Sequence, residues 1–484
     1  MKLPTNDMAT NFLNKATLYP WIIAVIFLLS VLKTNYDLFL IPTLCFEIGL
    51  FLVCFLTLHF AQRMFKNKVK GAIVAAFCFL FTFFFEDIHQ LYIGLYIGLP
   101  FRAKTAHTAI TLLFFAGCCF ALLVYILRKQ PSERATELTS GLTKVNSYFN
   151  FIFIIFFGIA LFKWQPFIPY TITLASPFSP QKTLERLPQK PNIYYLILDA
   201  YTGAESLRTY WQYDNTSFAD SLRNLGFFVT KNAKSNYDYT YYAMASNLNA
   251  SELNLCAFCE PNELYFKSAQ NTLALIKESR VPQYFQKQGY KIINYSLFDV
   301  QNTPKFYSDN DLWVEKNNWD VYLGKTLLMA LWNNLCRTKS IADEAAEVLY
   351  PNQEIFNQFY TDSLYQQEQP FFLYAHILMP HAPVCFDENG DKIDVALSAE
   401  QQYLAQLKYT NKLTLKALKH ILKNDKTNPI ILLQGDHGYR FFKALPLNDR
   451  RKEAHSIFSA YRVPDVIKQQ LNDSIKTINV FRLF

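Results

Sequence analysis

An acidic and an imidazole side chain are adjacent at Asp436 and His437, just after the apolar run Pro429–Leu433. Asp199 occupies the same kind of position after another apolar run, and Thr240 supplies a hydroxyl farther along the chain. Carboxylate, hydroxyl and imidazole groups are suitable ligands for a hard or borderline divalent cation. The residue types therefore predict a metal site formed by Asp199, Thr240, Asp436 and His437.

The chemistry expected of such a site is attack on a charged ester. A threonine hydroxyl is a weak nucleophile until a metal stabilises its alkoxide. The same cation would offset negative charge on a nonbridging oxygen of the ester. We therefore expect Thr240 to be the catalytic nucleophile and phosphorus to be the atom that it attacks.

The segments around these residues predict the sheet that positions them. Short apolar runs typical of buried strands alternate with helix-like stretches, which favours an α/β domain with a mostly parallel central sheet. The predicted strands are Ile193–Leu198, Phe227–Thr230, Lys291–Tyr295, Phe371–Leu378 and Pro429–Leu433. Ligands of such folds gather outside the carboxyl ends of strands, so the sheet is expected to bring Asp199 next to Asp436 and His437.

Two helices of this domain can be predicted from local signals. Asn215–Leu225 places Phe218, Leu222 and Leu225 on one face. Ser398 and Gln401 form a capping-box pattern at the start of a longer helix.

The first third of the chain has the composition of a membrane protein. Apolar residues are concentrated before position 170, and five runs approach the length that crosses a bilayer. These runs are Leu18–Leu32, Leu38–Ala61, Ala72–Phe85, Thr108–Leu127 and Tyr148–Phe167. We therefore predict a five-helix transmembrane bundle over residues 1–170, a proline-containing linker over 171–190 and a catalytic domain over 191–484.

Basic residues predict the orientation of this bundle. They gather in alternate loops, at Arg63, Lys66, Lys68 and Lys70 and again at Arg128, Lys129, Arg134 and Lys144. By the positive-inside rule these loops and the N-terminus are cytoplasmic, and the second half of the chain is extracytoplasmic. The loops also account for the net charge of +8. With no stripe of basic and aromatic residues, the sequence gives no reason to expect nucleic-acid binding.

The sequence resembles the alkaline phosphatase and sulfatase superfamily over roughly residues 190–484. Its membrane-anchored branch, the lipoteichoic acid synthases and phosphoethanolamine transferases, is the most similar. Asn192–Asp199 resembles the first strand with its acidic metal ligand, and Thr240 in Ser235–Thr240 resembles the nucleophile. His376 with Met379–Pro383 resembles the segment for substrate or a second metal, and Gln434–Gly438 matches the Asp-His-Gly element.

The resemblance implies an alkaline-phosphatase-like enzyme of a bacterial-type inner membrane, with its catalytic domain outside the cytoplasm. It would move phosphoethanolamine or phosphoglycerol from a phospholipid to Thr240 and then to a glycan or lipid acceptor of the cell envelope. The implied cofactor is zinc or manganese, as one ion with a second possible. His376, His381 and Arg440 would bind substrate phosphate or a second metal.

Two alternatives remain open from the sequence. The headgroup transferases usually carry Glu at the first ligand position, whereas Asp199 is commoner among hydrolytic relatives, so hydrolysis of phosphodiesters or sulfate esters is the second expectation. Because a Cys-x-Pro-x-Arg or Ser-x-Pro-x-Arg segment is missing, the formylglycine chemistry of true sulfatases is excluded. The third expectation, from another class, is a non-catalytic membrane-anchored envelope scaffold. The sequence also leaves open whether an element follows the apolar stretch Ile478–Phe484.

Overall fold

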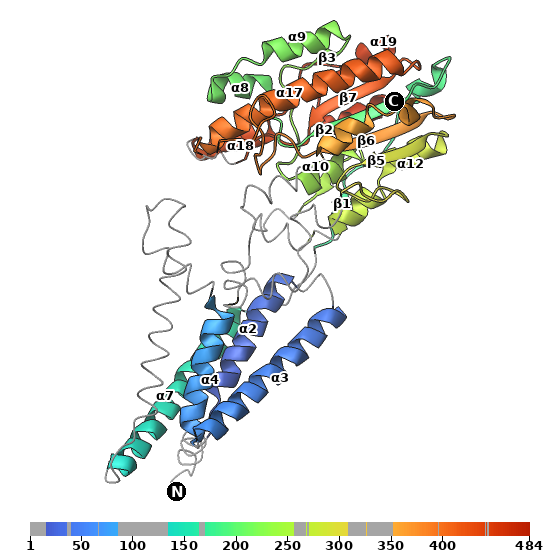
Figure 1. Cartoon of the computed structure of the whole chain (residues 1–484). Helices are drawn as coiled ribbons and strands as arrows, with labels where there is room; N and C mark the ends of the chain where they lie inside the picture. Colours follow the sequence, from blue (N-terminus) through green and yellow to red (C-terminus); the bar gives the residue numbers. More distant parts are fainter. Residues whose placement is uncertain are drawn as a thin grey trace. The chain divides into compact units, whose positions relative to one another are not determined.

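The computed structural model of the chain describes residues 16–35, 40–65, 67–85, 134–163, 170–255, 268, 271–307, 326, 352–394, 396–440, 442 and 445–484 (Figure 1). The chain divides into two compact units. The first is Met1–Ile168 with Lys316–Thr338, and the second is Pro169–Glu315 with Lys339–Phe484.

The described part of the first unit consists of long apolar helices. They are α2 (Tyr19–Asn35), α3 (Leu40–Met64), α4 (Lys68–Phe83) and α7 (Arg134–Lys163). Helix α2 contacts each of the other three. Small side chains at Ala72, Ala75 and Ala76 of α4 are buried among the aromatic rings of this bundle. Small residues allow helices to approach closely, which is typical of helix packing in membranes.

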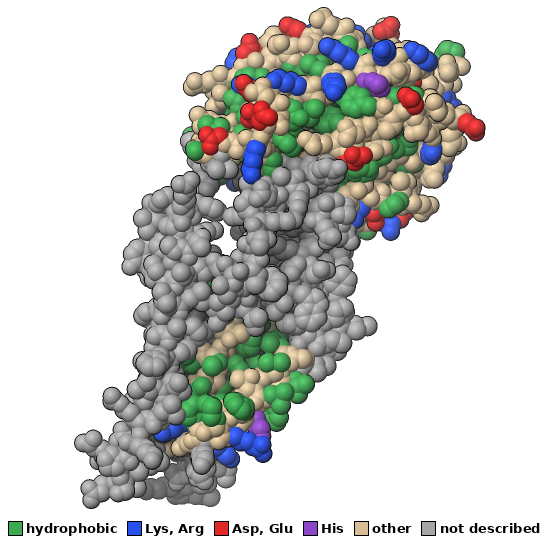
Figure 2. Space-filling model, viewed as in Figure 1, with side chains coloured by type: hydrophobic (Ala, Val, Ile, Leu, Met, Phe, Trp, Pro, Cys, Tyr) green, Lys and Arg blue, Asp and Glu red, His purple; other side chains and the backbone are tan. Residues whose placement is uncertain are grey.

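One helical stretch among the described residues, Gly141–Phe162 of α7, is long and apolar enough to cross a membrane. Tyr19–Leu29 and Gly49–Met64 are apolar but shorter. The predicted run Thr108–Leu127 lies outside the described residues. Figure 2 shows hydrophobic side chains over the helices of this unit and a group of Lys and Arg side chains at one end. The count of five spans therefore stays a prediction.

The second unit is built on a six-stranded sheet with the order β3-β8-β7-β2-β6-β5. Its strands are β2 (Ile193–Leu198), β3 (Phe228–Val229), β5 (Lys291–Tyr295), β6 (Phe371–Ile377), β7 (Ile430–Gly435) and β8 (Ser459–Arg462). Strands β5, β6, β2 and β7 are parallel, whereas β8 is antiparallel to both β7 and β3. The α/β prediction is confirmed, and the sheet is mixed because β8 runs against its neighbours.

Helices cover both faces of this sheet, with α8, α9 and α17 on one side and α10 and α12 on the other (Figure 1). Their bounds are α8 (Ala204–Trp211), α9 (Thr216–Asn224), α10 (Thr240–Asn247), α12 (Arg280–Lys287) and α17 (Ala399–Asn424), and α18 (Leu447–His455) follows β7. Every residue of β2, β6 and β7 is buried. Such unbroken apolar strands are expected where both faces of a sheet are covered.

The two predicted helices are present with the predicted signals. Helix α9 lies between Asn215 and Leu225, and its Phe218 and Leu222 are buried. Helix α17 begins at a complete capping box, in which the Ser398 hydroxyl accepts from the Gln401 N–H and the Gln401 side chain accepts from the Ser398 N–H. The remaining short elements of the unit are α16 (Asp362–Tyr365), α19 (Asp465–Lys468), α20 (Thr477–Val480) and η2 (Phe481–Leu483).

Residues 171–190, which the prolines predict to be a linker, pack on the second unit over part of their length. Strand β1 (Thr173–Leu174) pairs with β4 (Leu253–Asn254), and a 3-10 turn, η1, covers Thr183–Arg186. Ile172 and Leu184 are buried in the core of this unit. The boundaries 1–170, 171–190 and 191–484 stay predictions.

Candidate active site

Three adjacent strands place the candidate residues at one edge of the sheet. Leu198, the last residue of β2, pairs with Ile377 of β6 and with Gly435 of β7. Because these strands are parallel and in register, the residues that follow them leave the sheet together. Asp199 follows β2 directly and donates its backbone N–H to the Ile377 carbonyl at 2.9 Å. Asp436 and His437 follow β7.

Thr240 is the first residue of α10, and its Oγ1 lies 3.2 Å from Nε2 of His437. The two residues are far apart in the sequence, and they meet because α10 packs against the sheet that carries β7 (Figure 1). The first turn of a helix carries unpaired N–H groups and a partial positive charge, which favours an anionic oxygen. The position of Thr240 therefore suits a nucleophile.

His437 is held in one tautomer by its own loop. Its Nδ1 lies 2.7 Å from the Gly438 carbonyl oxygen, which can only accept, so Nδ1 carries the proton. Burial lowers the pKa of His437 below its ordinary value; the carboxylates of Asp436 and Asp199 oppose this shift, and Arg440 adds to it. A neutral imidazole with its lone pair on Nε2 is the form that binds metals.

Asp199 and Asp436 each have one oxygen engaged and one oxygen free. Oδ1 of Asp436 accepts the N–H groups of Ala200 (3.0 Å) and His437 (2.8 Å), whereas its Oδ2 is buried without a hydrogen-bond partner. Oδ2 of Asp199 lies 3.2 Å from Nε2 of His376, whereas its Oδ1 is also buried without a partner. Both free oxygens lie 3.6 Å from Nε2 of His437.

These separations match the size of a coordination shell. Ligand atoms around a tetrahedral cation with bonds of about 2.0–2.1 Å lie about 3.3–3.4 Å apart. The distances from Nε2 of His437 are 3.2 Å to Thr240 Oγ1 and 3.6 Å to each free carboxylate oxygen. Buried carboxylate oxygens without partners are costly unless a cation binds them. The donor set therefore fits a divalent metal.

The charge state of Asp199 also suits a cation ligand. Burial by itself would raise the pKa of this carboxyl, but the neighbouring His381 and the hydrogen bond from His376 outweigh it. The pKa of Asp199 consequently lies below its ordinary value, and the group is ionised. Ala200, the next residue, has φ = +57°. This left-handed conformation is uncommon for alanine and turns its N–H toward Asp436.

His376 contacts Asp199 from β6. Burial raises the pKa of Tyr374 well above its ordinary value, so the Tyr374 hydroxyl stays protonated and donates to Nδ1 of His376 at 3.0 Å. Nε2 then carries the proton of His376 and donates it to Asp199. This geometry suits a residue that orients the carboxylate of Asp199.

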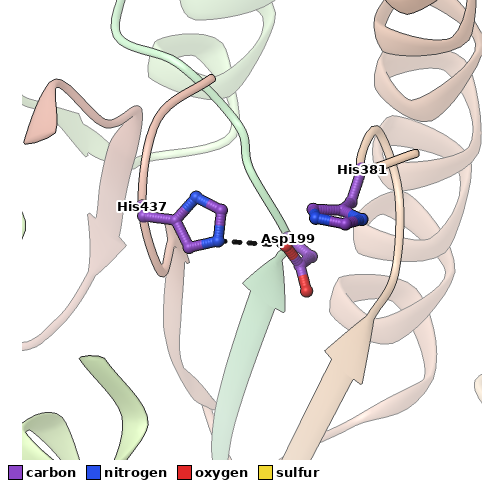
Figure 3. A group of neighbouring side chains, drawn as sticks. All are labelled: Asp199, His381 and His437. Atoms are coloured by element: carbon purple, nitrogen blue, oxygen red, sulfur yellow. Dashed lines mark ion pairs between the residues drawn. The ribbon is translucent and has the colours of Figure 1, made fainter. Parts of the chain in front are cut away.

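His381 and Arg440 lie around the same centre. Figure 3 shows His381, on the loop after β6, and His437, on the loop after β7, on opposite sides of Asp199. Two groups of three side chains each offer one possible ligand atom per residue, and within each group these atoms lie within 4.8 Å of one another. The groups are Asp199, His381 and His437, and Asp199, His376 and Asp436. The guanidinium carbon of Arg440 lies 4.5 Å from the ring centre of Tyr239, the residue before Thr240. All seven predicted site residues are thus brought together.

One buried residue next to this centre carries no signal in the sequence. Glu453 of α18 is fully buried and accepts hydrogen bonds from Thr202 Oγ1 (2.8 Å), Trp211 Nε1 (2.8 Å) and Ser206 Oγ. These partners belong to α8 and to the loop that follows Asp199. Helix α18 is polar along its length, so its sequence does not indicate which glutamate is buried.

The mixed α/β sheet and the metal-ligand cluster at its carboxyl edge define the class of this protein as an α/β enzyme. Residues 212–470, more than half of the chain, match the Sulfatase family model, and the chain belongs to this family of the alkaline phosphatase and sulfatase superfamily.

Several solved structures are similar to the chain at low identity. The integral membrane lipooligosaccharide phosphoethanolamine transferase A from Neisseria meningitidis is 12% identical with a TM-score of 0.34, over 97% of this chain and 94% of that one. The periplasmic domain of EcEptC from Escherichia coli, in complex with Zn, is 15% identical with a TM-score of 0.35, over 65% and 83%. The putative sulfatase yidJ from Bacteroides fragilis is 16% identical with a TM-score of 0.38, over 62% and 74%. Among curated protein sequences, none matches this chain.

Proposed function

We propose that this enzyme is a membrane-anchored, metal-dependent transferase. It takes phosphoethanolamine or phosphoglycerol from a phospholipid and passes it through Thr240 to a glycan or lipid acceptor of the cell envelope. The observation that carries the proposal is the convergence of Thr240 Oγ1 and two unpartnered carboxylate oxygens on Nε2 of His437.

Asp199, Thr240, Asp436 and His437 would hold one zinc or manganese ion, and His381 could serve a second. A divalent cation bound there would favour the alkoxide of Thr240 and offset charge on a nonbridging phosphate oxygen. The Gly438 carbonyl keeps His437 in the tautomer that offers Nε2. Arg440, beside Tyr239, would bind the phosphate through its guanidinium group.

The reaction would proceed in two displacements at phosphorus. In the first, Thr240 loses its proton to solvent, the bond from Thr240 Oγ1 to phosphorus forms, the bond from phosphorus to the diacylglycerol oxygen breaks, and that oxygen takes up a proton. In the second, the acceptor hydroxyl loses its proton to solvent and its oxygen forms a bond to the same phosphorus. The bond from phosphorus to Thr240 Oγ1 breaks, and Thr240 Oγ1 takes up a proton. The choice of headgroup rests on the resemblance of the motifs to the membrane-anchored branch of the superfamily.

Hydrolysis is the second candidate, and the identity of Asp199 favours it, because hydrolytic relatives more often carry Asp at this position. Water would then replace the acceptor in the second displacement. The product would be a free phosphoethanolamine or phosphoglycerol, or a sulfate if a sulfate ester is the substrate.

The membrane setting of the proposal rests on the first unit. Helix α7 exposes large apolar side chains such as Tyr148 (66%), Phe151 (57%) and Phe162 (91%), which would be stable in a lipid environment. The basic residues around α3 and α4 support a cytoplasmic N-terminus and an extracytoplasmic catalytic unit. We include the five spans and this orientation in the proposal.

The test uses the full-length protein in detergent with phospholipid labelled in the headgroup, with and without envelope extract. Transfer predicts diacylglycerol release and label on an acceptor; hydrolysis predicts label in a small water-soluble product. Thr240→Ala should abolish both transfer and hydrolysis, and diacylglycerol release should fall by at least about 100-fold.

The matched control is Thr410→Ala, which removes another threonine hydroxyl from the same unit. Thr410 is buried in α17, where its hydroxyl donates to the Gln406 carbonyl of the same helix. This variant should keep the activity of the unchanged protein. Unchanged turnover by Thr240→Ala would exclude the proposed mechanism.

A further inference from the structure

A cavity lies in the catalytic unit, and none of the candidate metal ligands is among its lining residues. It has a volume of about 730 Å³. Lining residues that bear on its chemistry are Glu205, Lys234, Asn236, His455, Ser456 and Lys476. This volume is within the range of about 300–1,000 Å³ found for small-molecule sites, and it exceeds what a single phosphate ion fills.

The walls of this cavity are fixed by backbone pairing. Lys234 forms one bridge with Ser456 and another with Lys476. The Ser235 N–H donates to the His455 carbonyl at 2.9 Å, and Nδ1 of His455 lies 3.0 Å from the Ser235 carbonyl oxygen. The cavity is therefore a formed feature of the unit, not a gap between loose loops.

The cavity adjoins both catalytic loops through the chain. Ser235 and Asn236 belong to the loop that leads directly into Thr240. On the other side, the Gly438 N–H donates to the carbonyl of Ala454, the residue before His455. A ligand in the cavity would thus contact the loop that ends at Thr240 and the end of α18, which is hydrogen-bonded to the loop that carries His437.

The lining groups indicate what kind of ligand fits. Most of the lining side chains can form hydrogen bonds, namely those of Asn232, Ser235, Asn236, His455, Ser456 and Ser474, and the Glu205 carboxylate and Ala233 complete this part of the lining. Such a surface suits a hydroxyl-rich ligand. Lys476 is paired with Glu252 at 3.1 Å, whereas Lys234 is an exposed cation that adds a site for an anionic substituent.

We propose that this cavity binds the acceptor, and that the acceptor is a glycan whose terminal sugar carries an anionic group recognised by Lys234. The proposal rests on the transferase function proposed above and names the substrate class of its second displacement. The neutral polar groups would bind the sugar hydroxyls, and the Lys234 ammonium would bind the anionic group.

The test compares two matched disaccharides, trehalose 6-phosphate and trehalose, together with inorganic phosphate. Binding to the metal-loaded full-length protein in detergent is measured by calorimetry. We expect trehalose 6-phosphate to bind at least about tenfold more tightly than either other probe, since hydroxyls and anion act together. Lys234→Gln should weaken the binding of trehalose 6-phosphate at least about tenfold and leave the binding of trehalose unchanged. Lys408→Gln, which removes a partly exposed cation of the same unit that is paired with Glu388 and lies outside the cavity lining, is the control and should bind as the unchanged protein does.

Each outcome decides for or against the cavity. Equal binding by the Lys234 and Lys408 variants, or phosphate binding as tightly as trehalose 6-phosphate, would overturn the proposal. The first turnover of diacylglycerol release measures the first displacement without the acceptor, and it should be the same in Lys408→Gln and in the unchanged protein. If release is absent while glycan binding follows the expected pattern, the transferase function fails and the glycan site stands. If release is present and no glycan binds, the cavity proposal fails alone.

Discussion

At the scale of single residues, Asp199 and Asp436 each have one carboxylate oxygen in contact with protein groups and a second oxygen that lies near Nε2 of His437. Each carboxylate has one oxygen in hydrogen bonds or in contact with His376, and this fixes the direction of the other. The two free oxygens are buried and lie at equal distances from Nε2 of His437. Without a cation they repel each other and lack partners, so metal binding should be coupled to stability.

We predict that zinc or manganese raises the free energy of unfolding of the catalytic unit. A ligand at 100 times its dissociation constant stabilises the folded state by about 2.7 kcal/mol. Asp436→Asn removes a negative ligand, so the metal-dependent shift in melting temperature should be lost. The measurement is thermal unfolding of the purified protein with metal and with EDTA.

Asp425→Asn is the control for this prediction. Asp425 is also buried, but its carboxylate accepts hydrogen bonds from Asn192 and the Tyr194 hydroxyl, away from the cluster. This variant should be less stable at every metal concentration and should keep the full shift. A shift that persists in Asp436→Asn would contradict the assignment of this ligand.

The sequence predicts the identities of the site residues but not their hydrogen bonds. Asp199, Asp436 and His437 can be found because each follows an apolar run, and parallel strands bring such positions together. The tautomer of His437 depends on the Gly438 carbonyl, and the orientation of Asp199 depends on His376 and Tyr374. These contacts depend on side-chain directions in three dimensions, which periodicity does not contain.

At the scale of elements, helix α18 supports the metal-ligand loop. The Gly438 N–H donates to the Ala454 carbonyl, and a Cβ at position 438 would lie 1.9 Å from the Glu453 carbonyl oxygen. The loop can approach the end of α18 this closely because residue 438 has no side chain. Glu453 in turn ties α18 to Trp211 of α8 and to Thr202.

Gly438→Ala should therefore lower both stability and metal affinity. The clash is with backbone atoms, which cannot rotate away, so the loop that carries His437 must shift, at a cost of about 1–3 kcal/mol. Unfolding by denaturant and metal titration measure the two effects. Gly226→Ala, where φ is +87° and no atom is nearer than 3.8 Å, should cost stability through backbone strain alone and leave metal affinity unchanged.

Glu453 predicts a pH dependence of stability. Burial raises the pKa of this carboxyl from 4.5 to about 7, although Trp211 and Thr202 oppose the shift. Between these two values the folded protein keeps a proton that the unfolded chain has lost. The contribution of Glu453 to the free energy of unfolding is therefore fully present below about pH 4.5. It is lost as pH rises through 7, which lowers the free energy of unfolding by about 3 kcal/mol.

Glu453→Gln removes this titration. The free energy of unfolding of the variant minus that of the unchanged protein should therefore increase by about 3 kcal/mol between about pH 4.5 and pH 8. Denaturant unfolding across this pH range measures the difference. A difference that stays constant with pH would contradict the raised pKa.

Strand prediction succeeded where apolar runs are long and failed at β8. Strands β2, β5, β6 and β7 coincide with predicted runs to within two residues at each end. Strand β8 has four residues, Ser459–Arg462, and includes a serine and an arginine. Its position is set by antiparallel pairing with β7 and β3, which no local pattern encodes.

At the scale of the whole molecule, the chain joins an apolar helical unit to an enzyme unit with few exposed large apolar side chains among its described residues. The exposed ones of the second unit are Leu273, Leu397, Leu447 and Val466, whereas α3 and α7 expose long series of Phe, Leu and Ile. Two units with such different surfaces suit two different solvents, lipid and water. The proposed orientation in the membrane rests on the basic residues Arg63, Lys68 and Lys70.

We predict that the lysines of the two units react from opposite sides of the membrane. On intact spheroplasts, a membrane-impermeant amine reagent should modify exposed lysines of the catalytic unit, such as Lys231 and Lys452, because the positive-inside rule predicts that this unit is outside. Lys68 and Lys70 should react after the membrane is disrupted and not before. Mass spectrometry of the digested protein identifies the modified positions. If Lys68 reacts on intact spheroplasts and Lys452 does not, the orientation is reversed, and a phospholipid donor would have to come from the cytoplasmic leaflet.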